Sequence, residues 1–258
     1  MLTFTYCMPN KICFLAIFLL PLFSCQKEAS TEGTAPPVTG TIVLNFHHIV
    51  KDKVLNFTDT YVNDHGEQYT VDGFKYYVHD IQFINDKNEA VPVSSDYFLV
   101  DETKPGTKTI TLAVPINKYT AVSWLLGVDS TRNVSGAQTG TLDPTNGMFW
   151  TWASGYIMAK LEGHSPASTL SGQVFTYHVG GYKHPYATYR NITVPLHQDI
   201  TVTKDTSITI GVNADIDHWF SRVHNIRIAS EPACHSPGQL ASEIADNYEG
   251  MFSVKEIF

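Results

Sequence analysis

His48 is the first residue whose type and setting could do chemistry. It closes an alternating run in which the other members are Ile42, Leu44 and Phe46. Side chains of a strand alternate between its two faces, so the pattern predicts that the imidazole points inward with these apolar residues. An inward imidazole is costly unless it is hydrogen-bonded or bound to a metal ion. For this residue taken alone, a hydrogen-bonded core histidine and a metal ligand are the two alternatives.

Two further histidines lie in glycine-flanked segments. His178 belongs to Tyr-His-Val-Gly-Gly at 177–181, and His235 belongs to Ala-Cys-His-Ser-Pro-Gly at 233–238. Strand ends and loops are where binding residues gather on sandwich scaffolds, and imidazole is the commonest transition-metal ligand. Cys234 could add a soft sulfur ligand, although a buried free cysteine is more often a small inert apolar residue.

Trp150 and Trp152 stand in a dense aromatic segment, Gly-Met-Phe-Trp-Thr-Trp-Ala-Ser-Gly-Tyr at 147–156. If strand alternation holds locally, the two indoles share a face. The cluster is oxidisable, and ordinary core packing is its structural alternative.

Short strands are the elements that must position these residues. Turn sequences, among them Lys-Pro-Gly at 104–106 and Asp-Pro-Thr-Asn-Gly at 143–147, separate apolar runs of period two. One helix is expected near the C-terminus, where Leu240, Ile244 and Tyr248 are spaced by four. We therefore expect an all-β protein, an antiparallel β-sandwich with long loops and one short C-terminal helix. The expected strands include residues 42–48, 74–83, 97–100, 110–114, 120–126, 157–161, 174–179, 192–196 and 208–212.

The N-terminus resembles a bacterial lipoprotein signal. Lys11 precedes an apolar run at 12–23 that is too short to span a bilayer, and Leu-Phe-Ser at 22–24 leads into Cys25. Cleavage before Cys25 would leave it as the lipid-carrying first residue, and an ordinary secretory signal cut slightly later is the alternative. We expect a signal peptide over 1–24, a flexible tether over 25–39 and one domain over 40–258. The protein is then exported and anchored to a membrane, not spanning it.

Composition limits the partners. The formal net charge of −8 argues against nucleic-acid binding, which requires clustered Lys and Arg. Of the four cysteines, two leave with the signal and Cys25 is committed to lipid, so Cys234 has no partner for an intramolecular disulfide. All 11 histidines lie in the mature part, a high number for an acidic domain.

A series of motifs from about Gly40 to the C-terminus is similar, in order, to one family. The longest are Gly-Val-Asp-Ser at 127–130, Gly-Met-Phe-Trp-Thr-Trp at 147–152, Phe-Thr-Tyr-His-Val-Gly-Gly at 175–181 and His-Ser-Pro-Gly at 235–238. Together they resemble the MbnP-like proteins, exported copper-binding proteins often found beside a MauG-like di-haem peroxidase.

The resemblance implies that the haem partner oxidises a tryptophan to kynurenine, whose aryl amine then joins histidines around copper. Trp150 is favoured as the modified residue, and Trp152 is the alternative; His48, His178 and His235 are the candidate histidine ligands. Cys234 and Trp152 are candidates for supporting the ligands. An aniline-type nitrogen with two imidazoles suits low-coordinate Cu(I). The implied protein is a binding protein and not an enzyme, held at the bacterial cell envelope and periplasmic or surface-exposed.

A structural or carbohydrate-contacting surface lipoprotein is the alternative function. It requires exposed aromatic rings in a groove, whereas the copper site requires Trp150 or Trp152 near at least two histidines. A hydrolase is disfavoured, because the sequence has no GxSxG, no HExxH and no evident nucleophile–base pair.

Overall fold

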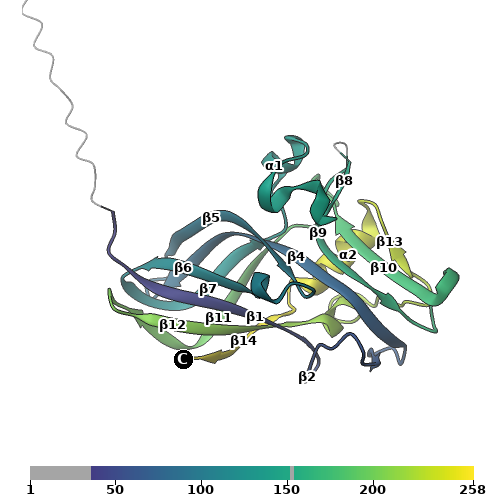
Figure 1. Ribbon diagram of the computed structural model, residues 1–258, viewed down its shortest axis with the longest axis horizontal. Coiled ribbons are helices and arrows are strands. Elements are labelled where there is room, and N and C mark those ends of the chain that lie inside the picture. Colours follow the sequence, from purple (N-terminus) through teal and green to yellow (C-terminus); the bar gives the residue numbers. More distant parts are fainter. Residues whose placement is uncertain (1–35, 152–153) are drawn as a thin grey trace, which may run out of the picture. The chain divides into compact units, whose positions relative to one another are not determined.

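Two β-sheets built from the predicted alternating runs pack against each other (Figure 1). The computed structural model describes residues 36–151 and 154–258. The predicted signal peptide and almost all of the predicted tether therefore lie outside the described residues. The all-β class and the sandwich architecture are confirmed.

The smaller sheet contains the strand that carries His48. Its order is β14 (Phe252–Ile257), β12 (Ser207–Asp215), β1 (Thr39–Val50) and β2 (Lys53–Val54), and β6 (Thr109–Pro115) also pairs with β1. β1 and β12 are parallel, in contrast to the wholly antiparallel sandwich expected. Only a short hairpin forces neighbouring strands to be antiparallel, and these two strands are far apart in the chain.

The larger sheet has nine strands, and β13 lies at the end of its main path. That path is β11 (Arg190–Val202), β7 (Asn117–Leu126), β4 (Gln68–Asn85), β9 (Gly155–His164), β10 (Val174–Gly180) and β13 (Ala233–Cys234). Three strands pair off this path: β3 (Tyr61–Val62) and β5 (Ala90–Asp101) with β4, and β8 (Phe149–Thr151) with β9.

β4 joins the two halves of the larger sheet. It pairs with β5 over residues 75–84, while β9 over 70–76 and then β7 over 78–85 share its other edge. β7 ends at Leu126, and the next residue, Gly127, has a φ of +116° and an added Cβ that would lie 2.9 Å from the sulfur of Met158. Only glycine tolerates both this backbone conformation and this close approach, so β7 and β9 can meet end to end.

Helices are few and short. α2 (Gln239–Tyr248) confirms the expected C-terminal helix, and α1 (Ser130–Val134) is a single turn capped by Asp129. The 3₁₀ turns are η1 (Pro105–Lys108), η2 (Gly140–Leu142), η3 (Pro144–Asn146), η4 (Ser171–Gln173) and η5 (Ile216–Trp219). Across residues 36–151 and 154–258, no helix combines the length and apolar character needed to cross a membrane.

Phe46 packs between the two sheets. From β1 it makes edge-on contacts with Tyr76 and Trp124 of the larger sheet, with ring centroids 6.0 and 5.8 Å apart. Edge-on aromatic pairs add to the free energy gained by burying the rings. The alternation that placed Phe46 and His48 inward is confirmed, because both side chains are buried.

Asp217, in η5, is a buried carboxyl group in an incompletely satisfied setting. Its Oδ2 lies 3.5 Å from Lys51 Nζ, and its Oδ1 has no hydrogen-bond partner among the described residues. The pKa of Asp217 is raised to about 6, mainly by burial and also by the neighbouring carboxylates Asp64 and Asp215, against the opposing effect of Lys51. The folded state therefore binds this proton more tightly than the unfolded state does.

We predict that Asp217→Asn increases the free energy of unfolding at pH 7.5 by about 1–3 kcal/mol, since ionising the folded wild type costs about 3 kcal/mol for two pKa units. The gain should shrink as the pH falls from 6 toward 4, where the wild-type carboxyl group is protonated in the folded state. Urea unfolding at pH 7.5 and pH 4.5 measures it. Asp205→Asn is the control, because Asp205 is exposed and is not among the groups that shift the pKa of Asp217. An equal gain at both pH values would contradict the assignment.

Candidate metal centre

His178 and His235 lie side by side at the end of the larger sheet. β10 and β13 pair in parallel, with Thr176 opposite Ala233 and Tyr177 opposite Cys234. The next step of this register sets His178 beside His235, and their ring centroids are 4.7 Å apart. His178 is half-buried and His235 is exposed. The structure thus brings together two of the three candidate histidines.

Each of the two imidazoles is held through its Nε2 atom. Nε2 of His178 lies 2.8 Å from Oε1 of Glu162, and Nε2 of His235 lies 2.6 Å from the hydroxyl of Thr176. The Nζ of Lys160 lies 3.1 Å from the same oxygen of Glu162. Among the described residues, Nδ1 is therefore the ring nitrogen without a hydrogen bond in both histidines.

Burial and neighbouring charges shift the pKa of two groups in this cluster. The hydrogen bond from His178, helped by Lys160, lowers the pKa of Glu162 to about 2, so its carboxylate is ionised. Burial lowers the pKa of His235, and the adjacent His178 lowers it further. A neutral imidazole is the form that offers a lone pair to a metal ion.

Trp150, on β8, places its ring against Gly180 of β10. An added Cβ on Gly180 would lie 2.8 Å from Cζ3 of the Trp150 ring, so the glycine makes room for the indole. Gly180 follows His178 by two positions on β10, about 7 Å along the strand, across an irregularity in its pairing with β9. Trp152, the other candidate for modification, lies outside the described residues.

Cys234 lies on the opposite side of its strand from His235. The strand registers align Phe74, Leu161, Tyr177 and Cys234 in one row, and all four side chains are buried in the core. Burial raises the pKa of the Cys234 thiol to about 11, which disfavours the thiolate that metals bind. Cys234 therefore packs behind the candidate ligands in the core.

The structure does not bring His48 to this pair. Its Nδ1 lies 2.7 Å from Oε2 of Glu102 and its Nε2 lies 3.0 Å from the hydroxyl of Tyr76. Its ring also packs edge-on against Phe74, which belongs to the inward-facing row. His178 belongs to the next row, with Lys160, and so occupies the other face of the larger sheet. His48 is a hydrogen-bonded core histidine.

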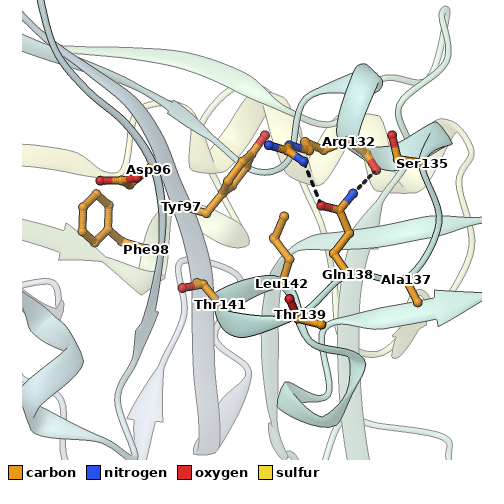
Figure 2. A pocket seen from close by; sticks show the side chains of 10 residues that line it. All are labelled: Asp96, Tyr97, Phe98, Arg132, Ser135, Ala137, Gln138, Thr139, Thr141 and Leu142. Atoms are coloured by element: carbon orange, nitrogen blue, oxygen red, sulfur yellow. Dashed lines mark hydrogen bonds between the residues drawn. The ribbon is translucent and has the colours of Figure 1, made fainter.

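A shallow pocket of about 820 Å³ lies between β5 and the segment at 132–142 (Figure 2). Arg132 and Gln138 are hydrogen-bonded at one wall, with 3.1 Å between Nη1 and Oε1. Figure 2 shows Tyr97 on one side of β5 and Phe98 on the other, as strand alternation requires. The two rings do not make a common aromatic platform, and none of the predicted site residues lines this pocket.

Sequence reasoning missed three side chains that hold the histidine pair: Lys160, Glu162 and Thr176. A signal was present in the segment 157–163, Ile-Met-Ala-Lys-Leu-Glu-Gly, where two charged residues stand two positions apart in an otherwise apolar strand. That spacing places both on one face, which is the face of His178. Among the described residues, no group of three or more His, Cys, Asp or Glu side chains could hold a metal ion.

Comparison with known proteins identifies the family of this chain. The family model described as MbnP matches residues 39–236, a range that includes Trp150, His178 and His235. Among solved structures, MbnP from Methylosinus trichosporium is similar with a TM-score of 0.49 and 16% sequence identity, covering 73% of this chain and 80% of that one. No curated protein matches the chain. Because the family model covers well over half of the sequence, the chain belongs to the MbnP family.

Proposed function

We propose that this protein binds copper through His178, His235 and a group derived from Trp150, and that it acts as a binding protein, not as an enzyme. The MbnP family is copper-related. The observation that carries the proposal is the pair of imidazole rings, with centroids 4.7 Å apart, together with the Trp150 ring packed on Gly180, two residues after His178.

The donor set suits a site with few ligands. Two imidazoles offer two lone pairs, and the described His, Cys, Asp and Glu side chains do not converge to complete a larger set. An indole nitrogen has no lone pair available for a metal, whereas the aryl amine of kynurenine does. Two imidazoles and one amine would favour Cu(I). We propose that Trp150 supplies the third ligand once it has been oxidised.

The oxidation requires a partner. Conversion of tryptophan to kynurenine opens the indole, adds oxygen to the side chain and releases one carbon as formate, so it needs an external oxidant. We propose a MauG-like di-haem peroxidase that uses hydrogen peroxide in this role. Trp150 is half-buried, which is compatible with oxidation by a partner that docks on the surface.

We predict that Trp150→Phe abolishes tight copper binding and the mass change of kynurenine formation, while Trp152→Phe preserves both. The proteins would be produced together with the peroxidase, then compared by intact mass and by Cu(I) competition against a chromophoric chelator. His178→Ala and His235→Ala should each weaken binding, because each removes one ligand. His164→Ala is the matched control, an exposed histidine on the same sheet that pairs with Asp72. Unchanged binding in the double variant Trp150→Phe/Trp152→Phe would contradict a tryptophan-derived ligand.

His48 should behave differently from the two ligands. We predict that His48→Ala lowers the free energy of unfolding by about 2–4 kcal/mol, because it leaves a cavity in the core and the buried Tyr76 hydroxyl without its partner, while Glu102 keeps its contact with Lys108. Copper affinity of the folded variant should stay within about threefold of the wild type, a change smaller than 1 kcal/mol. Urea unfolding and chelator competition separate the two effects. A folded His48→Ala protein that no longer binds copper would return His48 to the ligand set.

We further propose that Cys25 is lipidated and holds the domain at a bacterial membrane, facing the periplasm or the exterior. The support is the junction Leu-Phe-Ser-Cys at 22–25 behind a short apolar run. Cys25→Ser should block lipid attachment and shift the protein from the membrane to the soluble fraction, or stop its maturation. Incorporation of labelled palmitate and cell fractionation measure this. Equal membrane retention of the variant would contradict lipid anchoring at Cys25.

A further inference from the structure

We infer that Glu162 is the positioning residue of this centre, holding His178 in the tautomer whose Nδ1 carries the lone pair, so that a metal ion binds His178 through Nδ1. Metal binding through Nδ1 rests on the proposed copper function. The tautomer of His178 is a property of the protein before any metal is bound.

The geometry of β9 and β10 builds this contact. His178 is directly opposite Lys160, and Glu162 is directly opposite Thr176. Glu162 is thus the diagonal neighbour of His178, and its Oε1 lies 2.8 Å from Nε2. Lys160 binds the same oxygen at 3.1 Å and fixes the carboxylate from the other side. On the adjacent strand β4, Gly73 lies directly opposite Glu162.

The chemistry of the acceptor selects the tautomer. An ionised carboxylate can only accept hydrogen bonds, so Nε2 of His178 must carry the proton. A neutral imidazole has one N–H and one lone pair, and the lone pair is then on Nδ1. A carboxylate behind a metal-binding imidazole also strengthens it as a donor, the usual role of such outer partners.

Glu162 differs in this respect from the partner of His235. The Thr176 hydroxyl can donate or accept, so it orients the His235 ring without selecting which nitrogen is protonated. The two histidines therefore differ: the partner of His178 selects its tautomer, whereas the partner of His235 does not.

If Glu162 only stabilised the fold, the expected effects of removing it would be different. The side chains of Glu162 and His178 are 33% and 20% exposed, and ion pairs near the surface contribute little to stability. If Glu162 contributed only to stability, Glu162→Ala would shift the unfolding midpoint slightly and leave the tautomer of His178 unchanged. The tautomer is thus the measurement that separates positioning from stabilisation.

The first test is imidazole ¹⁵N NMR of the metal-free, unoxidised protein at pH 8. We expect His178 to be the Nε2–H tautomer in the wild type and a mixture in Glu162→Ala. Glu162→Gln should preserve much of the Nε2–H form, because its amide oxygen can still accept the bond. Asp72→Asn is the matched control, since it removes the carboxylate 2.7 Å from His164 on the same sheet. A wild-type His178 with the proton on Nδ1, or a Glu162→Ala protein with an unchanged tautomer, would overturn the inference.

The second test is Cu(I) competition with the oxidised proteins. Glu162→Ala should bind about 10–100-fold more weakly than the wild type, while Asp72→Asn should not change the affinity. An unchanged affinity in Glu162→Ala would overturn the functional part of the inference. If the wild type itself bound no copper, the proposed function would fail, and the NMR experiment would still decide whether Glu162 sets the tautomer.

Discussion

The register of the larger sheet is the constraint on which the candidate centre depends. Direct pairing of β4, β9, β10 and β13 sorts their side chains into rows that alternate between the two faces. One row holds Phe74, Leu161, Tyr177 and Cys234 in the core, and the next holds Lys160 and His178 on the other face. A shift of one residue would bury the histidines and expose the aromatic residues. The core therefore fixes the position of the centre.

The short strand β13 matters more than its two residues suggest. It is separated from β10 by more than fifty residues, and its parallel pairing is what brings His235 to His178. On its other side, the Cys234 thiol is buried in the core, and α2 follows directly in the chain. Packing behind the strand thus supports the exposed candidate ligand His235 in front of it.

Charged and polar groups orient the histidines of the candidate centre. Glu162 is ionised between Lys160 and His178, and Thr176 holds His235. His48 shows the contrasting use of the same side chain, because Glu102 and Tyr76 occupy both of its nitrogens within the core. An imidazole with both nitrogens occupied stabilises the fold, whereas one with a free lone pair can bind a metal. The surroundings of each ring decide between the two roles.

The sequence by itself determined the all-β class, the inward direction of His48, the C-terminal helix and the family, since each follows from local periodicity or from motifs in order. It also selected His178, His235 and Trp150 from the glycine-flanked motifs. Only the tertiary structure decided that His178 and His235 are neighbours, that His48 lies on the other face of the sheet, and that Cys234 points into the core. The parallel pairing of β1 with β12 and of β10 with β13 could not be predicted from the sequence either. These outcomes depend on pairing between strands distant in the chain, and alternation within one strand specifies the face of a side chain without specifying its neighbour.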